Sequence, residues 1–219
     1  MIFATAAVGS KYINCIYRQK EFLDFHNFDV HILTDKPEMF SKEYTTYKYE
    51  NTVWSYFDKL TFAFRLNLQH KEDVFFSDGD DIDHLDNNFG EEFKGSKNFL
   101  YKGDWSAGNT LWDTDHFTLP YWDPFTKFLK KQNVDPKDIL TLVEQHFYIP
   151  KNIDSLSILR DLETVKPVLE YTSIMGDSPY PGLGSGEGAG LGYALTKNNI
   201  QIEKFNLKYF LNHEVYTMD

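Results

Sequence analysis

The regular alternation of apolar runs with helically spaced segments over the first 80 residues restricts the fold of this chain more than any other feature. One near-continuous apolar run covers residues 2–8 and ends at Gly9, and a second, shorter run, interrupted by His31 and followed by Thr34 and Asp35, marks a short strand at 30–35. Continuous apolar runs of this length are typical of strands that are buried on both faces of a parallel sheet. Residues 11–26, between the two runs, carry apolar side chains at helical spacing. Because parallel strands need a crossover connection, the pattern predicts a right-handed strand, helix, strand unit.

The same pattern continues further along the chain. A third strand is predicted at 44–49, an amphipathic helix at 54–69 and a fourth buried strand at 73–77. Within this helix the apolar residues recur three or four positions apart, which places them on one face. The predicted fold class is therefore α/β, with a mixed, mostly parallel sheet flanked by helices.

The second half of the chain is less regular. We expect it to belong to the same single domain, residues 1–219, because a chain of 219 residues is an ordinary length for one domain. Strands are predicted at 98–102, 106–112 and 201–204, and helices at 124–132, 137–147, 154–164 and 189–198.

The chain is strongly acidic. It contains 33 acidic and 22 basic residues, which gives a formal net charge of −11. Such a chain has no overall positive field to hold a phosphate backbone, so nucleic acid is not an expected partner. An anionic small substrate would need a metal ion or a few local cations to offset the field of the protein.

Cysteine content and hydropathy decide the expected location. Cys15 is the only cysteine, so it cannot form an internal disulfide, which is typical of a reducing compartment such as the cytoplasm. No run of apolar residues is long enough to span a membrane, so no membrane span is expected. Any anchor would have to lie outside this chain.

Several carboxylates follow the fourth predicted strand directly. Asp78, Asp80, Asp81 and Asp83 stand where that strand would end, and open α/β sheets bind ligands at the carboxyl ends of their strands. On an extended chain the side chains of Asp78 and Asp80 lie on the same side, and Gly79 between them lets a ligand approach the backbone. Carboxylate oxygens are ligands for Mg²⁺ and Mn²⁺. The pattern indicates a divalent-metal site, and a solvated acidic turn is the alternative.

The segment 78–80 resembles the DXD motif of GT-A glycosyltransferases. The opening of the chain, at 2–12 and 28–35, also resembles the first two strands of the histo-blood-group and α-1,3-galactosyltransferase family. The resemblance implies a GT-A fold, with residues 1–85 as the nucleotide-binding half and 86–219 as the acceptor-binding half. It further implies that Asp80 binds Mn²⁺ or Mg²⁺, and that Asp78 touches the nucleotide ribose or the water shell of the metal.

The same resemblance implies a donor site at the end of the first strand. Thr5, Ala6 and Tyr12 would hold the uridine of a nucleotide sugar, with the Tyr12 ring stacked on the base. Packing of Tyr12 on the sheet is the alternative for this residue. Lys59 matches a position that reaches the nucleotide in related enzymes, and a solvated lysine is the alternative.

The end of the chain resembles a different family, the fringe-like β-1,3-glycosyltransferases. The resemblance is carried by residues 186–195 and 209–213. It implies that Glu187 opens a helix beside the acceptor and acts as the base, although Gly188 stands where that family has a second acid. It also implies that His213 completes the metal shell, for which an imidazole is suited next to carboxylates. A tail histidine without a role is the alternative.

Further residues between the two ends match positions of glycosyltransferases. The stretch 105–110, which includes Gly108, resembles the small-residue strand that passes under the donor sugar, and a strand packed closely on a helix is the alternative. Glu144 falls where the blood-group-like family has an acid pair used in retaining transfer, but Gln145 replaces the second acid. Four large rings are expected either to stack on the acceptor sugar or to lie in the core: Trp105, Trp112, Tyr121 and Trp122.

Together these features predict a soluble, metal-dependent glycosyltransferase that moves a sugar from a nucleotide sugar, with UDP as the expected carrier, to a hydroxyl of a glycan or similar acceptor. The stereochemical outcome stays open, because the two halves resemble families of opposite outcome. One alternative is a sugar nucleotidyltransferase, for which residues 6–11 would form a poor phosphate loop. The other is a catalytically silent carbohydrate-binding module, which has no need for carboxylates at a strand end.

Overall fold

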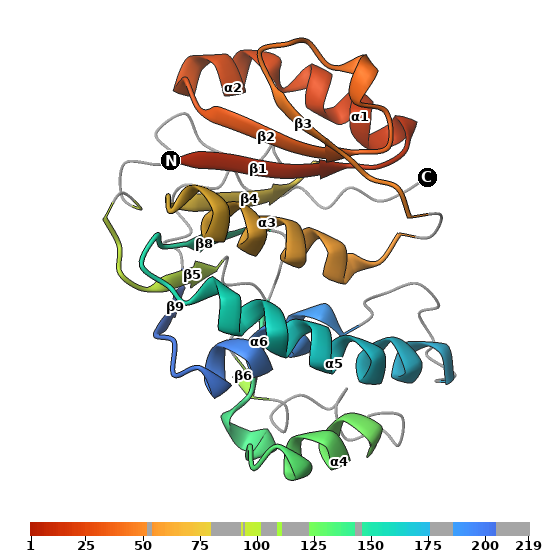
Figure 1. The fold of residues 1–219 in the computed structure, drawn as a ribbon, viewed down its shortest axis with the longest axis vertical. Helices are drawn as coiled ribbons and strands as arrows, with labels where there is room; N and C mark the ends of the chain where they lie inside the picture. Colours follow the sequence, from red (N-terminus) through yellow and green to blue (C-terminus); the bar gives the residue numbers. More distant parts are fainter. Residues whose placement is uncertain are drawn as a thin grey trace.

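The strands of the main sheet lie side by side in the order β3-β2-β1-β4-β8-β5-β9 (Figure 1). The computed structural model describes residues 1–51, 54–79, 93, 95–101, 109–110, 123–142, 146–175 and 186–204. In this sheet β8 runs antiparallel to its neighbours β4 and β5, whereas the other neighbouring strands are parallel. The strands are β1 (Ile2–Ala7), β2 (Asp29–Thr34), β3 (Thr45–Lys48), β4 (Val74–Asp78), β5 (Phe99–Tyr101), β8 (His146–Ile149) and β9 (Ile202–Lys204).

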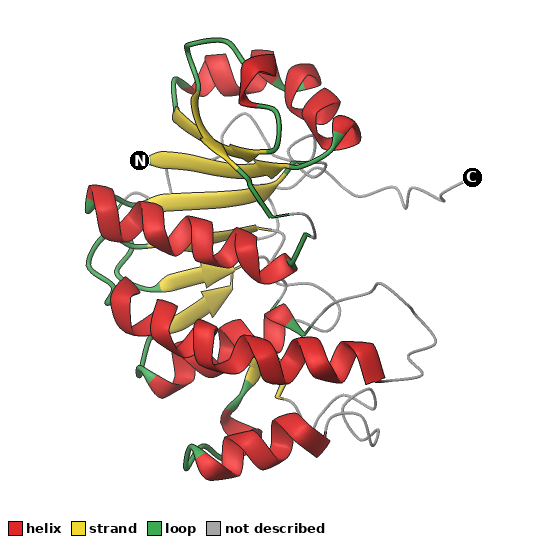
Figure 2. Cartoon of the chain, turned by 45° about the vertical axis from the view of Figure 1, so that its right-hand side comes forward, coloured by secondary structure: helices red, strands yellow, loops and turns green. Residues whose placement is uncertain are grey.

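Helices cover both faces of the sheet. The smaller layer contains α1 and α2, and the larger layer contains α3, α5 and α6, with α4 packed against α5 (Figures 1 and 2). Two short strands, β6 and β7, pair antiparallel outside the main sheet. The bounds of these elements are α1 (Ser10–Arg18), α2 (Lys20–His26), η1 (Pro37–Met39), α3 (Tyr56–His70), β6 (Asn109–Thr110), α4 (Asp123–Lys131), η5 (Pro136–Asp138), β7 (Leu140–Thr141), α5 (Ser155–Met175) and α6 (Glu187–Lys197).

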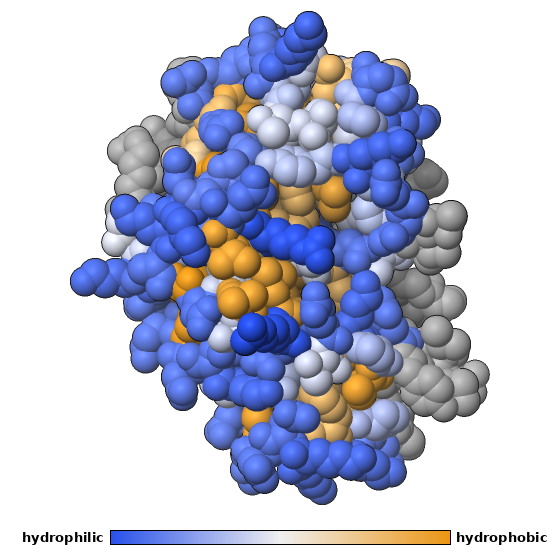
Figure 3. Space-filling model, viewed as in Figure 1, coloured by the Kyte–Doolittle hydropathy of each residue, from blue (hydrophilic) through white to orange (hydrophobic). Residues whose placement is uncertain are grey.

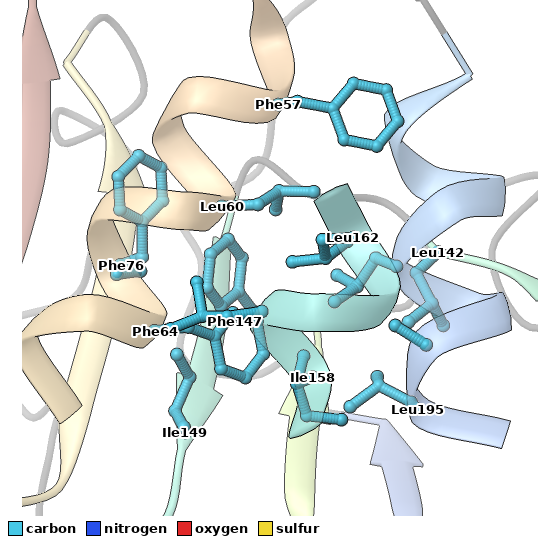
Figure 4. Packing of buried hydrophobic residues seen from close by; sticks show 14 of the residues in the cluster. Phe57, Leu60, Phe64, Phe76, Leu142, Phe147, Ile149, Ile158, Leu162 and Leu195 are labelled. Carbon is cyan, nitrogen blue, oxygen red and sulfur yellow. The ribbon is translucent and has the colours of Figure 1, made fainter. Parts of the chain in front are cut away.

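The side chains of β1 alternate between two cores, because successive residues of a strand point to opposite faces of the sheet. Ile2 and Ala4 belong to the larger core, and Phe3 and Ala7 belong to the smaller core against α1. Figure 4 shows the larger core, in which residues of α3, β8 and α5 converge. Since both faces of β1 are covered, its sequence is a continuous apolar run and not an alternating one.

The face of the molecule in Figure 3 is mostly hydrophilic, with an apolar region over the end of α3 and the start of α5. Leu156, the second residue of α5, is 43% exposed. Among the residues that the structure describes, no helix combines the length and the apolar character needed to cross a membrane.

The α/β class and the mixed, mostly parallel sheet are confirmed. The four strands expected in the first half are all present, and the helix expected at 54–69 is α3. The helix expected at 11–26 is divided into α1 and α2 at Gln19. The helix expected at 154–164 is longer, because α5 continues through Pro167 to Met175.

The prediction of a helix at 137–147 is wrong. This segment begins with η5, continues into β7 and ends in β8, whose residues pair with β4. Short apolar segments do not distinguish a buried strand from a helix by their periodicity alone. Long-range pairing with β4 therefore decides the conformation of residues 146–149, and this pairing cannot be read from the local pattern.

Candidate functional site

The carboxyl ends of β1 and β4 bring together four of the residues expected at the donor site. The two strands are parallel neighbours, in which Thr5 is paired with Ser77 and Ala6 with Asp78. Gly79 follows β4 directly and lies against the end of β1. Thr5, Ala6, Asp78 and Gly79 thus lie at one edge of the sheet, which is where open α/β sheets bind ligands.

Lys59 reaches this edge from α3. Its Nζ lies 2.9 Å from Oδ2 and 3.3 Å from Oδ1 of Asp78, and its side chain is only 4% exposed. The pairing is possible because α3 packs along the face of β4 to which Phe76 contributes, and Asp78, two residues further on, points to the same side. The solvated alternative for Lys59 is wrong, because the residue is a buried partner of Asp78.

The Lys59 and Asp78 pair places a fixed cation at the edge of an acidic protein. A buried ammonium and a buried carboxylate are each costly to desolvate, and each offsets the cost of the other. The Asp78 side chain remains 23% exposed, so the pair is not completely enclosed. A polar ligand at this edge would therefore meet the Asp78 carboxylate, with the Lys59 ammonium behind it.

Thr5 and Gly79 form an uncommon neighbourhood at the same sheet edge, where the Thr5 side chain lies on the α1 face, opposite the Lys59 and Asp78 pair. The Thr5 Oγ1 is buried and has no hydrogen-bond partner among the described residues, which costs about 1–3 kcal/mol unless a bound group satisfies it. A Cβ at Gly79 would stand 2.9 Å from the Ala6 carbonyl oxygen and 3.7 Å from Thr5 Oγ1. Any side chain at position 79 would clash with β1, so only glycine fits at this position.

The loop after β1 is tied to the loop after β2. Gly9 has a φ of 91°, and its N–H donates a 2.9 Å hydrogen bond to Oδ1 of Asp35. Lys36 Nζ donates to the Ser10 hydroxyl at 3.3 Å. Asp35 was not among the predicted site residues, although its place at the end of a predicted strand is the signal that puts it near the same edge.

Tyr12 lies in α1 and is partly buried against the smaller core. The Nζ of Lys11 lies 5.1 Å from the centroid of its ring. This position agrees with the packing alternative, and the stacking of a base on the exposed part of the ring stays a prediction.

A buried histidine that was not among the predicted site residues also lies near the end of β4. The Nδ1 of His146, in β8, is 3.0 Å from Ser77 Oγ, and the two residues are register partners in the antiparallel pair. Ser77 immediately precedes Asp78. No ligand spacing in the sequence could reveal this contact, because it depends on the pairing of β4 with β8.

The first turn of α3 carries a second polar cluster. The Tyr49 hydroxyl, just after β3, donates a 2.7 Å hydrogen bond to Oδ2 of Asp58. Burial and this hydrogen bond to a carboxylate raise the pKa of Tyr49 to about 12. Asp58 directly precedes Lys59, so the cluster adjoins in sequence the lysine that reaches the carboxyl ends of β1 and β4.

Glu187 is buried at the start of α6. The helix begins at Glu187 and not at Ala189 as expected, after Gly186 in the left-handed region with a φ of 71°, and Glu187 is 3% exposed. One turn further on, a Cβ at Gly190 would stand 2.7 Å from the Phe57 ring. The start of α6 therefore lies against the turn of α3 that leads to Lys59.

The remaining candidates lie outside the described residues. Among the residues that are described, no group of three or more His, Cys, Asp or Glu side chains is placed to hold a metal ion. The candidates outside the description are Asp80, Gly108, Glu144 and His213, together with Trp105, Trp112, Tyr121 and Trp122.

Comparison of the sequence with known proteins identified no relative of this chain. No protein-family model matches the sequence, and no curated protein matches it either.

Proposed function

We propose that this chain is a metal-dependent glycosyltransferase of the GT-A type, which moves a sugar from a nucleotide sugar, with UDP as the carrier, to a hydroxyl of a carbohydrate acceptor. The observation that carries the proposal is the Lys59 and Asp78 pair at the end of β4. The Thr5 hydroxyl, which has no partner among the described residues, and the backbone of Gly79 lie at the same sheet edge. A chain of net charge −11 needs a local cation at the place where it binds an anionic donor.

The donor is assigned to the ends of β1 and β4. The Thr5 hydroxyl and the Ala6 backbone would bind the uridine, and the exposed part of the Tyr12 ring would stack on the base. The ammonium of Lys59, held by Asp78, would face the diphosphate. Negative charge develops on the diphosphate as it leaves, and a preorganised cation stabilises that charge without having to reorient.

The proposed metal ligands are the carboxylates of Asp78 and Asp80 and the imidazole of His213. Their chemistry suits Mn²⁺ or Mg²⁺. Asp78 already shares its carboxylate with Lys59. We therefore assign Asp78 to orienting Lys59 and to contact with the ribose or the metal's water shell, and we assign direct ligation to Asp80 and His213. A bound divalent ion would supply charge neutralisation for the leaving diphosphate.

The acceptor is assigned to the second half of the chain. Glu187, at the start of α6, is the proposed general base of an inverting reaction, in which it takes the proton of the acceptor hydroxyl. Glu144 is the candidate acid on the sugar side if the reaction is retaining. Gly108 is assigned to the floor under the donor sugar, and the second-half tryptophans to stacking on the acceptor.

The loop after β1 favours glycosyl transfer over nucleotidyl transfer. A phosphate-binding loop needs free backbone N–H groups, whereas the Gly9 N–H is bonded to the carboxylate of Asp35. A carboxylate in that position would repel the phosphates of a nucleoside triphosphate. The single cysteine, Cys15, is buried and fits a reducing compartment, so we place the protein in the cytoplasm.

The test is a screen of nucleotide sugars for release of the nucleotide diphosphate, with Mn²⁺ and with a chelator. We expect release from a UDP-sugar with Mn²⁺ only, and a reduction of about tenfold or more in Lys59→Met. The matched control is Lys197→Met, which removes a lysine ion-paired with Asp161 far from β4 in the sequence. If no donor is turned over and UDP with Mn²⁺ does not bind in calorimetry, the proposal is rejected.

A further inference from the structure

We infer that Lys166, in α5, is a positioning residue for the donor site, because with Glu170 it holds the first turn of α3 in the place from which Lys59 reaches Asp78. The importance of this for the donor rests on the proposed function. The positioning itself concerns contacts within the chain, so it can be tested without any ligand.

Two residues one turn apart on α5 bind two residues at the start of α3. Lys166 Nζ lies 2.9 Å from Asp58 Oδ1, and the Ser55 hydroxyl donates a 2.6 Å hydrogen bond to Glu170 Oε1. Lys166 and Glu170 are themselves 3.8 Å apart. α5 thus contacts both the residue that caps α3 and the residue three positions later.

These contacts replace the ordinary stabilisation of a helix start. The residues Ser55 and Asp58 have the spacing of a capping box, in which the two side chains would bind the backbone of their own helix. Here Ser55 makes no side-chain capping hydrogen bond, and its hydroxyl donates instead to Glu170. The carboxylate of Asp58 is bonded to Tyr49 and Lys166. The place of the first turn is therefore determined by α5 and by the end of β3, and not by α3 alone.

Three consecutive residues of this turn contact three different elements. Phe57 points toward α6 (Figure 4) and meets it at Gly190. Asp58 binds Lys166 in α5, and Lys59 binds Asp78 in β4. Because a helical turn is rigid, a shift that follows the loss of one contact also displaces the next residue. Lys59 is thus directed at Asp78 only while Asp58 stays held.

Loss of the Lys166 ammonium would leave a poorly hydrated carboxylate. The Asp58 side chain is 14% exposed, so without its cation it would gain from a movement of the turn toward water. We expect this movement to uncover Lys59, whose side chain is 4% exposed in the intact protein.

The chain offers a closely matched control for the test. The Lys197 and Asp161 pair has an N–O distance of 2.7 Å and exposures of 34% and 13%, compared with 2.9 Å, 31% and 14% for Lys166 and Asp58. Each pair joins α5 to another helix, but the control pair joins it to the end of α6. A general loss of stability would therefore affect both variants alike, whereas a change at Lys59 would be specific to Lys166.

The experiment measures the acetylation rate of Lys59 by acetic anhydride, read by mass spectrometry of the full chain without ligand, in Lys166→Met, Lys166→Arg and Lys197→Met. We expect a several-fold increase in Lys166→Met, a rate near wild type in Lys166→Arg and no change in Lys197→Met. An unchanged rate in Lys166→Met, or an equal increase in Lys197→Met, overturns the inference. If Lys166→Met does not fold, the neutral double variant Asp58→Asn/Lys166→Met replaces it. This variant loses the tie to α5 but strands no carboxylate, so we expect a smaller increase over wild type, and an unchanged rate overturns the inference.

A second measurement relates the positioning to the donor. In calorimetry with UDP and Mn²⁺, Lys166→Met should bind about tenfold more weakly than wild type, while Lys197→Met should bind equally well. If wild type does not bind UDP at all, the proposed function fails, and the acetylation rates still decide the positioning. If UDP binds equally to all variants although Lys59 has become reactive, Lys166 does not act on the donor site.

Discussion

Lys59 and Asp78 satisfy each other, so replacing one of them alone removes the main compensation for the other. Lys59 is almost completely buried, whereas Asp78 retains partial access to water. Breaking a buried ion pair costs more than replacing both of its members, because the remaining charge stays where it is poorly hydrated. The two residues should therefore behave as one unit in mutational experiments.

A double-mutant cycle tests this pairing. We expect Asp78→Asn to lower the free energy of unfolding by about 2 kcal/mol, which is less than for a fully buried pair because Asp78 is partly exposed. The double variant Lys59→Met/Asp78→Asn should be more stable than Asp78→Asn, since no charge is left behind. Urea unfolding of wild type, Lys59→Met, Asp78→Asn and the double variant measures the four free energies of unfolding that the cycle needs. Additive effects of the two substitutions would mean that the pair is not coupled.

The two members of this pair differ in how far the sequence identifies them. Asp78 stands where an apolar strand opens into carboxylates, which is a local signal. Lys59 is one polar residue in an amphipathic helix, and only a resemblance pointed to it. Its contact with Asp78 depends on the crossover that places α3 against β4. The contact between His146 and Ser77 likewise depends on a strand pair that no local pattern reveals.

Among the elements, the first half could be predicted because each strand or helix there is specified by its own pattern. β1 is a nearly continuous apolar run, β2 and β4 have apolar centres, and α3 has a regular apolar spacing. The segment 137–147 lacks such a pattern. Its β7 residues pair with β6, and its last residues belong to β8, which pairs with β4. Elements whose conformation depends on a distant partner are the ones that local reasoning assigns wrongly.

The packing of α6 also depends on distant partners and gives a second prediction. Replacement of glycine by alanine inside a helix normally adds stability. At Gly190, however, the new Cβ would stand 2.7 Å from the Phe57 ring and 3.1 Å from Leu169, so we expect Gly190→Ala to cost about 1–3 kcal/mol. Gly192→Ala should cost more, because its Cβ would meet the backbone carbonyl of Leu140, which cannot rotate away as a ring can.

Thermal unfolding of the two glycine variants provides the measurement. Both melting temperatures should fall below that of wild type, with Gly192→Ala the lower of the two. A variant that melts above wild type would show that α6 is not pressed against α3 and β7 as the structure has it.

The hydrogen bond between Tyr49 and Asp58 gives a third prediction, on the pH dependence of the start of α3. Burial and the carboxylate raise the pKa of Tyr49 from 10.0 to about 12. A phenol whose pKa is raised on folding stabilises the folded state fully below the pKa of the unfolded chain, near 10, and loses this contribution as the pH rises through about 12. Tyr49→Phe should therefore be less stable than wild type near neutral pH, by about 1 kcal/mol.

The comparison needs unfolding curves of both proteins across that pH range. The difference between wild type and Tyr49→Phe should be constant from neutral pH to about pH 10 and should shrink above it. Other tyrosines that titrate at high pH affect both proteins equally, so the difference isolates Tyr49. A difference that stays constant through pH 12 would contradict the raised pKa.

For the whole molecule, the distribution of charge matters more than any single contact. A chain with a net charge of −11 repels a nucleoside diphosphate sugar, and Lys59 offsets little of that repulsion because its charge is paired with Asp78. A divalent cation bound with the donor would supply the rest. The affinity for the nucleotide sugar should therefore depend strongly on a divalent ion. The affinity for a neutral ligand of the same site should not.

Calorimetry with UDP and with uridine tests this last prediction. In wild type, Mn²⁺ should strengthen UDP binding strongly and leave uridine binding unchanged, because only UDP carries the diphosphate.

Asp80→Asn keeps the size of the side chain but removes its charge, so UDP affinity in Mn²⁺ should fall about tenfold, which corresponds to about 1.4 kcal/mol. His213→Ala should need a higher Mn²⁺ concentration for the same affinity and recover in excess metal, as expected of a lost ligand. Uridine affinity is the internal control for an intact base site at Thr5 and Tyr12. If Asp80→Asn binds UDP as wild type does in Mn²⁺, the carboxylates after β4 do not hold a metal, and Lys59 alone must balance the diphosphate.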